Sequence, residues 1–328
     1  MYNRPEQVLE LYDLEIKSIA RGRRAYICET NCGTKILKEY KGSMERAEFL
    51  AEILDFLKAH QLRVETIVRT KEDEPAAMDN DDTKYMLCGT FEGVECDTKN
   101  RDHILAGARE LARLHLVSRE YQGDIPEFVK SEPDAMLWLY EKHNRELNKV
   151  KNYIRTKKKK NEFEVRFMEQ YHYFMEKAKE VTDLLAMQKL DAGLVGFCHG
   201  DYNQHNLLFE KSEAAIVRFD AFSYQVQMAD LANFMRKMLE KQNWNCGLAL
   251  DMIRAYDKER KLGEEEIRLL YLYLAYPEKF WKIANHYYNS HKAWLSGRDI
   301  EKLGKVVEQE KARSEFLEML FRLAKVME

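Results

Sequence analysis

An aspartate and an asparagine stand five residues apart in the segment HGDYNQHN, residues 199–206, which lies between two short apolar runs. This pattern suits phosphoryl transfer, because an aspartate can accept the proton of an attacking hydroxyl while a loop asparagine holds a phosphate-bridging metal ion. Asp201 and Asn206 are the candidates for these two roles, and His199 is expected to fix the shape of the loop. Asp and Asn also satisfy backbone groups in ordinary turns. A purely structural turn is therefore the alternative interpretation, and His205 is expected to be structural.

The elements that would position this loop change character along the chain. Short apolar runs alternate with turn signals over the first ninety residues, which predicts strands over 14–20, 25–30, 34–40, 62–70 and 84–91. Ser43 is predicted to cap a single helix that runs to about His60. From about Thr98 onward the apolar spacing becomes helical, over 101–119, 134–156, 161–189, 228–241, 246–258, 264–275 and 299–327.

This change predicts two lobes joined near Gly89–Gly93. Residues 1–92 are expected to form a small lobe with a mainly antiparallel sheet and one helix. Residues 93–328 are expected to form a large helical lobe that carries the loop at 199–206 and the acceptor region. The fold class is therefore α+β.

The segment HGDYNQHNLLF resembles the catalytic loop of the aminoglycoside phosphotransferase and choline kinase superfamily, which is distantly related to protein kinases. The resemblance implies a bilobal, protein-kinase-like fold with Asp201 and His199 in the catalytic loop and Asn206 on the metal. Lys38 matches the lysine that contacts nucleotide phosphates, and Glu48, or Glu52 one turn on, matches its partner glutamate. An exposed ion pair of this kind contributes only about 0–1 kcal/mol to the free energy of unfolding. Lys38→Ala is therefore expected to leave the melting temperature nearly unchanged.

The sequence departs from the superfamily at the metal-binding strand. Counting back from Asp230, in a helix that resembles the superfamily's D-L-A helix, the position of the metal-binding aspartate holds Arg218. Asp220 shares a strand face with that position and is the candidate replacement ligand. The guanidinium of Arg218 is expected to pair with Asp201 or Asp220.

The hairpin expected to lie over the nucleotide is also unusual. It has Gly22 but three arginines around it, Arg21, Arg23 and Arg24. Arginine side chains would bind phosphate there in place of glycine amides. A solvated turn is the alternative.

A longer resemblance runs over essentially the whole chain. GDYNQHNLLF and the unusual aromatic stretch from Tyr276 to Trp294 resemble the CotS family of spore coat proteins, in the version of clostridial spore formers. This resemblance implies synthesis in the cytoplasm of the sporulating mother cell and deposition in the spore coat. The aromatic residues recur on a helical period, which favours a packed core over a ligand platform.

Two functions follow from these resemblances. The first is a coat-associated, kinase-like protein whose phosphotransferase site is degenerate or weak, with weak or absent binding of ATP and Mg²⁺. The second is an active small-molecule or saccharide kinase that transfers the γ-phosphate of ATP to a hydroxyl. The expected partners are other spore coat proteins or an anionic small molecule or saccharide.

Composition limits the other functions. The 328 residues carry a formal net charge of −3, which argues against a protein that coats nucleic acid. One segment, KVKNYIRTKKKK at 149–160, has seven basic residues and no acid, so it is either an anion-docking arm or a solvated surface. The six cysteines form no C-x-x-C pair, which favours buried thiols over zinc ligands. No signal peptide or membrane-spanning segment is expected.

Overall fold

The computed structural model describes residues 5–22, 25–289 and 297–326. It divides into two compact units. The first unit comprises residues 1–130, 196–224 and 258–260, and the second comprises 131–195, 225–257 and 261–328. The predicted boundary at residues 92 and 93 falls inside the first unit, so the division into lobes at that point stays a prediction.

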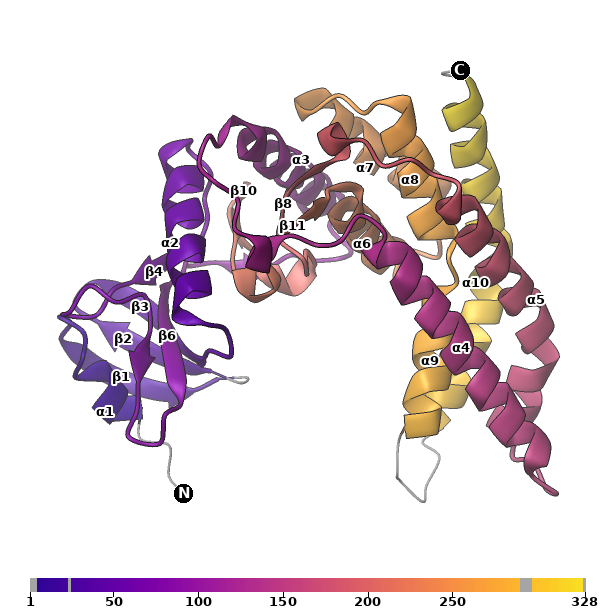
Figure 1. The fold of residues 1–328 in the computed structure, drawn as a ribbon, viewed down its shortest axis with the longest axis horizontal. Helices are drawn as coiled ribbons and strands as arrows, with labels where there is room; N and C mark the ends of the chain where they lie inside the picture. The colour runs from indigo at the N-terminus through magenta and orange to yellow at the C-terminus, as the bar shows by residue number, and fades with distance from the viewer. Residues whose placement is uncertain (1–4, 23–24, 290–296, 327–328) are drawn as a thin grey trace. The chain divides into compact units, whose positions relative to one another are not determined.

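The first unit contains an antiparallel sheet, drawn in indigo and violet in Figure 1, with the path β1-β2-β3-β6-β4 and with β5 paired to β6. Its strands are β1 (Ile16–Arg21), β2 (Tyr26–Thr30), β3 (Gly33–Glu39), β4 (Thr66–Val68), β5 (Ala77–Met78) and β6 (Lys84–Gly89). The turn between β2 and β3 uses Gly33 at φ 83°, a conformation open to glycine. Lys38 lies opposite Met86 in the register of β3 and β6. The predicted antiparallel sheet is confirmed.

Helix α2 (Met44–Ala59) packs against this sheet, and the side chain of Ser43 accepts a hydrogen bond from the backbone N–H of Arg46. The predicted cap and helix are therefore confirmed. A second, short helix that the sequence did not predict, α1 (Pro5–Leu9), precedes the sheet. The apolar face of α2 is buried, which orders it on the sheet. Its members are Ala47, Phe49, Leu50, Ala51, Ile53, Leu54 and Leu57.

The rest of the first unit carries the loop at 199–206. Strands β10, β9 and β7 form a small antiparallel sheet. The elements in chain order are β7 (Val94–Glu95), α3 (Arg101–Val117), the turns η1 (Ser118–Glu120) and η2 (Glu127–Val129), β8 (Val195–Cys198), η4 (Gln204–Asn206), β9 (Leu207–Glu210), β10 (Glu213–Ile216), η5 (Phe219–Ala221) and β11 (Ser223–Val226). The chain passes between the two units after Lys130, within β8, within β11, and on both sides of the segment 258–260.

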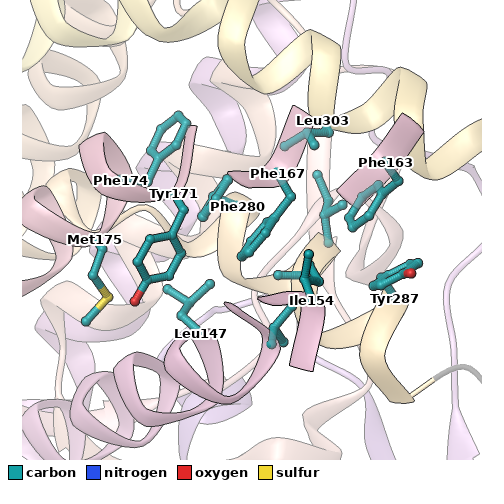
Figure 2. Packing of buried hydrophobic residues seen from close by; sticks show 13 residues of the cluster. Leu147, Ile154, Phe163, Phe167, Tyr171, Phe174, Met175, Phe280, Tyr287 and Leu303 are labelled. Atoms are coloured by element: carbon teal, nitrogen blue, oxygen red, sulfur yellow. The ribbon is translucent and has the colours of Figure 1, made fainter. Parts of the chain in front are cut away.

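The second unit is helical, apart from the turn η3 (Ala192–Leu194) and the ends of β8 and β11. Its helices are α4 (Ala135–Thr156), α5 (Glu162–Ala186), α6 (Met228–Leu239), α7 (Cys246–Glu259), α8 (Glu264–Ala275), α9 (Glu278–Asn289) and α10 (Gly297–Val326). Figure 2 shows aromatic and aliphatic side chains of α4, α5, α9 and α10 packed into one core. Phe280 and Tyr287 belong to it, as the helical period predicted, whereas Tyr288 is 42% exposed. Trp294 lies outside the described residues.

Candidate active site

His199 holds the loop at 199–206 in shape, as the sequence predicted. The residue is fully buried. Its Nε2 lies 3.0 Å from the carbonyl oxygen of Val217, and its Nδ1 accepts a hydrogen bond from the backbone N–H of Asp201 at 3.2 Å. These contacts require the tautomer that carries its proton on Nε2. The imidazole thus joins the start of the loop to the segment that follows β10.

Two asparagines close the loop on the backbone of Asp201. The side-chain amides of Asn203 and Asn206 both donate to the carbonyl oxygen of Asp201, at 2.7 and 2.8 Å. Asn206 is buried, whereas Asp201 is exposed. The structure therefore brings Asp201 and Asn206 into one turn, as the spacing predicted.

Gly200 allows the loop to approach the turn η5. Its φ is +80°, and a Cβ added there would lie 2.0 Å from the carbonyl oxygen of Ala221. The loop is also anchored to α3, because the buried hydroxyl of Tyr202 donates to the carbonyl oxygen of Gly107 at 2.7 Å. His205 contacts the carboxylate of Glu95 on β7, in agreement with a structural role.

Lys38 is buried on β3 and faces two carboxylates of the first unit. Its Nζ lies 2.7 Å from Oδ1 of Asp220 and 3.6 Å from Oε1 of Glu65, and the residue is 9% exposed. Burial alone would lower the pKa of Lys38. The negative charges of Glu65 and Asp220 raise it by more than burial lowers it, so the pKa lies above the ordinary lysine value. The lysine is therefore a buried cation with carboxylate partners.

The predicted pair of Lys38 with Glu48 or Glu52 is wrong. Glu48 binds the guanidinium of Arg69, and Glu52 accepts a hydrogen bond from Tyr121 at 2.6 Å. The reason is that the buried apolar face of α2 fixes how the helix is rotated about its axis, and hence which way Glu48 and Glu52 point.

Phe49 on that face lies in an aromatic cluster. Its ring centroid is between 6.1 and 6.4 Å from the rings of Tyr121, Phe128, Phe197 and Phe222. With Phe49 directed into this cluster, the acids at 48 and 52 are left on the exposed side of the helix.

Glu65 is the site residue that sequence reasoning missed. It precedes β4, is 4% exposed and accepts the backbone N–H of Phe219 at 2.7 Å. The signal that could have found it is an acid within the apolar run LRVETIV, because a charge placed between residues that face a core needs a buried partner.

Arg218 adopts the left-handed conformation, with φ 66° and ψ 58°. Its Nη1 donates to Oδ1 of Asn206 at 3.5 Å. The expected partners were Asp201 and Asp220, but the hydrogen bond goes to the asparagine and Asp220 instead contacts Lys38. The left-handed turn explains this result, because it breaks the strand geometry that would have placed residues 218 and 220 on one face.

The two candidate magnesium ligands, Asn206 and Asp220, both face cationic side chains. Magnesium needs oxygen ligands at about 2.0–2.1 Å and near-octahedral geometry. Oδ1 of Asn206 accepts a hydrogen bond from the guanidinium of Arg218, and Oδ1 of Asp220 lies on the ammonium of Lys38, so each of the two candidate ligands already has one oxygen on a cationic nitrogen. Arg218 stands at the position where the resemblance to the phosphotransferases implies a metal-binding aspartate.

The buried hydroxyl of Tyr40 has no hydrogen-bond partner among the residues that the structure describes. Burial raises the pKa of Tyr40 above the ordinary tyrosine value. Of the nearby charges, Arg46 and Lys38 lower this pKa and Asp220 raises it. The hydroxyl is therefore an unused donor in a region that contains two cations. Arg23 and Arg24 of the first hairpin lie outside the described residues.

The basic segment 149–160 spans the end of α4 and the turn before α5. Lys157, expected to belong to an anion-docking arm, is instead bound to the buried carboxylate of Glu164, which also accepts a hydrogen bond from Tyr287. Burial raises the pKa of Glu164, but the hydrogen bonds from Lys157 and Tyr287 lower it to a net value below the ordinary one. Lys158, Lys159 and Lys160 are exposed.

Comparison with known proteins places the chain in a family. The family model described as "Spore coat putative kinase YutH" matches residues 5–320, so the chain belongs to this family. Spore coat protein S of Bacillus subtilis (strain 168) is 23% identical over 334 residues, which cover 97% of this chain and 94% of that protein.

Solved structures agree on the fold. An aminoglycoside phosphotransferase from Alicyclobacillus acidocaldarius subsp. acidocaldarius DSM 446 has a TM-score of 0.83 at 18% identity, covering 99% of this chain and 97% of that chain. An amicoumacin kinase in complex with AMP-PNP and Ca²⁺ has a TM-score of 0.67 at 13% identity, covering 96% and 94%.

These comparisons confirm the resemblance to spore coat kinase-like proteins and the α+β, aminoglycoside phosphotransferase-like fold. Within the described residues, no helix combines the length and the apolar character that crossing a bilayer requires.

Proposed function

We propose that this member of the spore coat kinase family is a coat-associated protein whose phosphotransferase site is degenerate or strongly reduced. Its nucleotide site would then act as a binding or structural element. The observation that carries the proposal is Arg218, whose guanidinium lies on Asn206, the residue expected to hold the metal.

Electrostatics supports a large loss of metal-dependent activity. A magnesium ion on Oδ1 of Asn206 would lie within about 6 Å of Nη1 of Arg218, given a metal–oxygen distance of about 2.1 Å. At an effective dielectric of 20, a divalent and a univalent cation at that separation repel by roughly 6 kcal/mol. Each ~1.4 kcal/mol corresponds to a tenfold change in rate. We therefore expect phosphotransfer at least about a thousandfold slower than in a relative with the aspartate.

The cellular setting of this proposal follows the family. The related Spore coat protein S supports a coat setting for this chain. We infer synthesis in the cytoplasm of the mother cell before deposition in the coat. Other coat proteins, or an anionic small molecule or saccharide, are the partners we propose, and binding of ATP and Mg²⁺ is expected to be weak or absent.

An active small-molecule or saccharide kinase is the second candidate. The retained loop geometry favours it, because Asp201 and Asn206 lie in one turn and Lys38 is a buried cation. In this reading Asp201 is the base, Asn206 and Asp220 hold Mg²⁺ after displacement of the cations, and Lys38 binds ATP.

ATP consumption by the purified protein separates the two candidates. We expect no Mg²⁺-dependent turnover by the wild type, and a gain of Mg²⁺-dependent ATP binding in Arg218→Asp. Arg218→Ala is the matched control, because it removes the positive charge without adding a ligand and is expected to gain less. Robust Mg²⁺-ATP consumption by the wild type that is lost in Asp201→Asn would falsify the first candidate and favour the second.

A further inference from the structure

Glu65 contacts both Lys38 and the turn that carries Asp220. Its Oε1 lies 3.6 Å from Nζ of Lys38 and accepts the backbone N–H of Phe219 at 2.7 Å. We propose that Glu65 is the positioning residue for Lys38, in place of the acid that helix α2 was expected to supply. This inference rests on the proposed function in one respect, namely that Lys38 faces the phosphates of a bound anion.

The backbone around Glu65 is fixed on both sides. The N–H of Glu65 donates to the carbonyl oxygen of Ile216 at 3.0 Å, and the N–H of Ile216 donates to that of Arg63 at 2.8 Å. Val64 and Ile216 form a parallel bridge. The segment before β4 is therefore joined to the end of β10, which fixes the backbone at Glu65. The carboxylate of Glu65 is held in turn by the hydrogen bond from the N–H of Phe219.

The two carboxylates that meet Lys38 differ in exposure. The side chain of Asp220 is 54% exposed, whereas that of Glu65 is 5% exposed. An incoming anion that takes the place of Asp220 at Nζ can leave Asp220 in water at little cost. A buried ammonium needs a carboxylate partner to stay in place, and Glu65 provides it throughout the exchange.

The acids of α2 are not available for this role. Glu48 is held by Arg69, and the rotation of the helix is set by Phe49 in its aromatic cluster. The position of Lys38 therefore depends on the junction between the sheet and β10, and not on a movement of α2.

The test compares Glu65→Gln with Glu48→Gln in the full chain. Glutamine keeps an oxygen that can accept the N–H of Phe219 and removes the charge that faces Lys38. Binding of pyrophosphate and of ATP is measured by calorimetry, each in EDTA and in Mg²⁺. We expect Glu65→Gln to weaken the binding that the wild type shows by about tenfold or more, and Glu48→Gln to change it by less than about twofold.

Two measurements without ligand accompany the binding data. Hydrogen exchange at the Phe219 amide is expected to be unchanged in Glu65→Gln. A double-mutant cycle on urea unfolding, with Lys38→Met as the second change, is expected to show coupling between positions 38 and 65 and none between 38 and 48.

The possible results distinguish the role of Glu65 from the premise that Lys38 binds an anion. If the wild type binds neither anion, the premise that Lys38 faces the phosphates of a bound anion fails, and the cycle still decides whether Glu65 is the partner that positions Lys38. Coupling of Lys38 to Glu48 instead of Glu65 would overturn the inference. Faster exchange at Phe219 in Glu65→Gln, with binding lost in parallel, would also overturn it, because the role of Glu65 would then be structural.

Discussion

Gly200 should be the least replaceable residue of the loop at 199–206. Two separate energetic costs oppose its replacement. A residue with a Cβ at φ +80° loses about 1–2 kcal/mol from the left-handed conformation alone. The Cβ would also lie 2.0 Å from the carbonyl oxygen of Ala221, so the loop or the turn η5 must move. Forced repacking of this kind costs typically about 1–3 kcal/mol more. We expect Gly200→Ala to lower the free energy of unfolding by about 2–5 kcal/mol.

Gly33 provides the matched control for this substitution. It has φ +83°, and an added Cβ would meet no atom within 4 Å. Gly33→Ala therefore carries the conformational cost without the clash, and we expect it to lose only about 1–2 kcal/mol. Urea unfolding of both variants, followed by tryptophan fluorescence and circular dichroism, measures the difference. Equal losses in the two variants would refute the argument, because they would show that the close approach of the loop to η5 adds no cost.

Three further predictions concern the buried charges and the basic segment. Lys38→Ala is expected to lower the free energy of unfolding by about 3–5 kcal/mol, because it leaves the buried carboxylate of Glu65 without its cationic partner. A melting temperature within about 1 °C of the wild type would contradict this expectation. The folded pKa of Glu164 lies below its ordinary value of 4.5, so its stabilising contribution is complete above that pH and is lost as the pH falls below it. Thermal melts of Glu164→Gln should accordingly show a shallower decline below pH 4.5 than the wild type. Replacing Lys158–Lys160 with Gln should reduce retention on heparin at low salt and leave stability unchanged, and unchanged retention would leave only the solvated-surface interpretation.

Local patterns predicted much of the fold and part of the site. The turn signals between the apolar runs of the first ninety residues, the Ser43 cap and the helical spacing of apolar residues are all local patterns in the sequence. The structure confirms the antiparallel sheet and the capped helix that they predicted. The loop around Asp201 was predictable for the same reason, because its hydrogen bonds join residues that are close together in the chain.

The partner of Lys38 was not predictable in this way. Its identity depends on the rotation of α2 about its axis, which Phe49 fixes through rings at positions 121, 128, 197 and 222. The same holds for Glu65, which meets Phe219 across 154 positions of sequence. These contacts follow from packing between distant segments, which neither spacing nor charge pattern encodes. For the same reason the expectation that Lys38→Ala is harmless no longer stands, since it assumed an exposed pair.

The survival of the catalytic-like motif does not by itself separate an active kinase from a degenerate one. Asn206 donates its side-chain amide to Asp201, donates its backbone N–H to Asn203 and accepts the N–H of Val217. His199 is equally bound into the loop. Both residues would therefore resist replacement in a protein that had lost all phosphotransfer, because their loss would unmake the loop. Arg218 differs, since it is exposed and hydrogen-bonds through its side chain to Asn206 alone among the described residues. Folding therefore places little constraint on residue 218, so the comparison of Arg218→Asp with Arg218→Ala tests the function of this position with little effect on the loop.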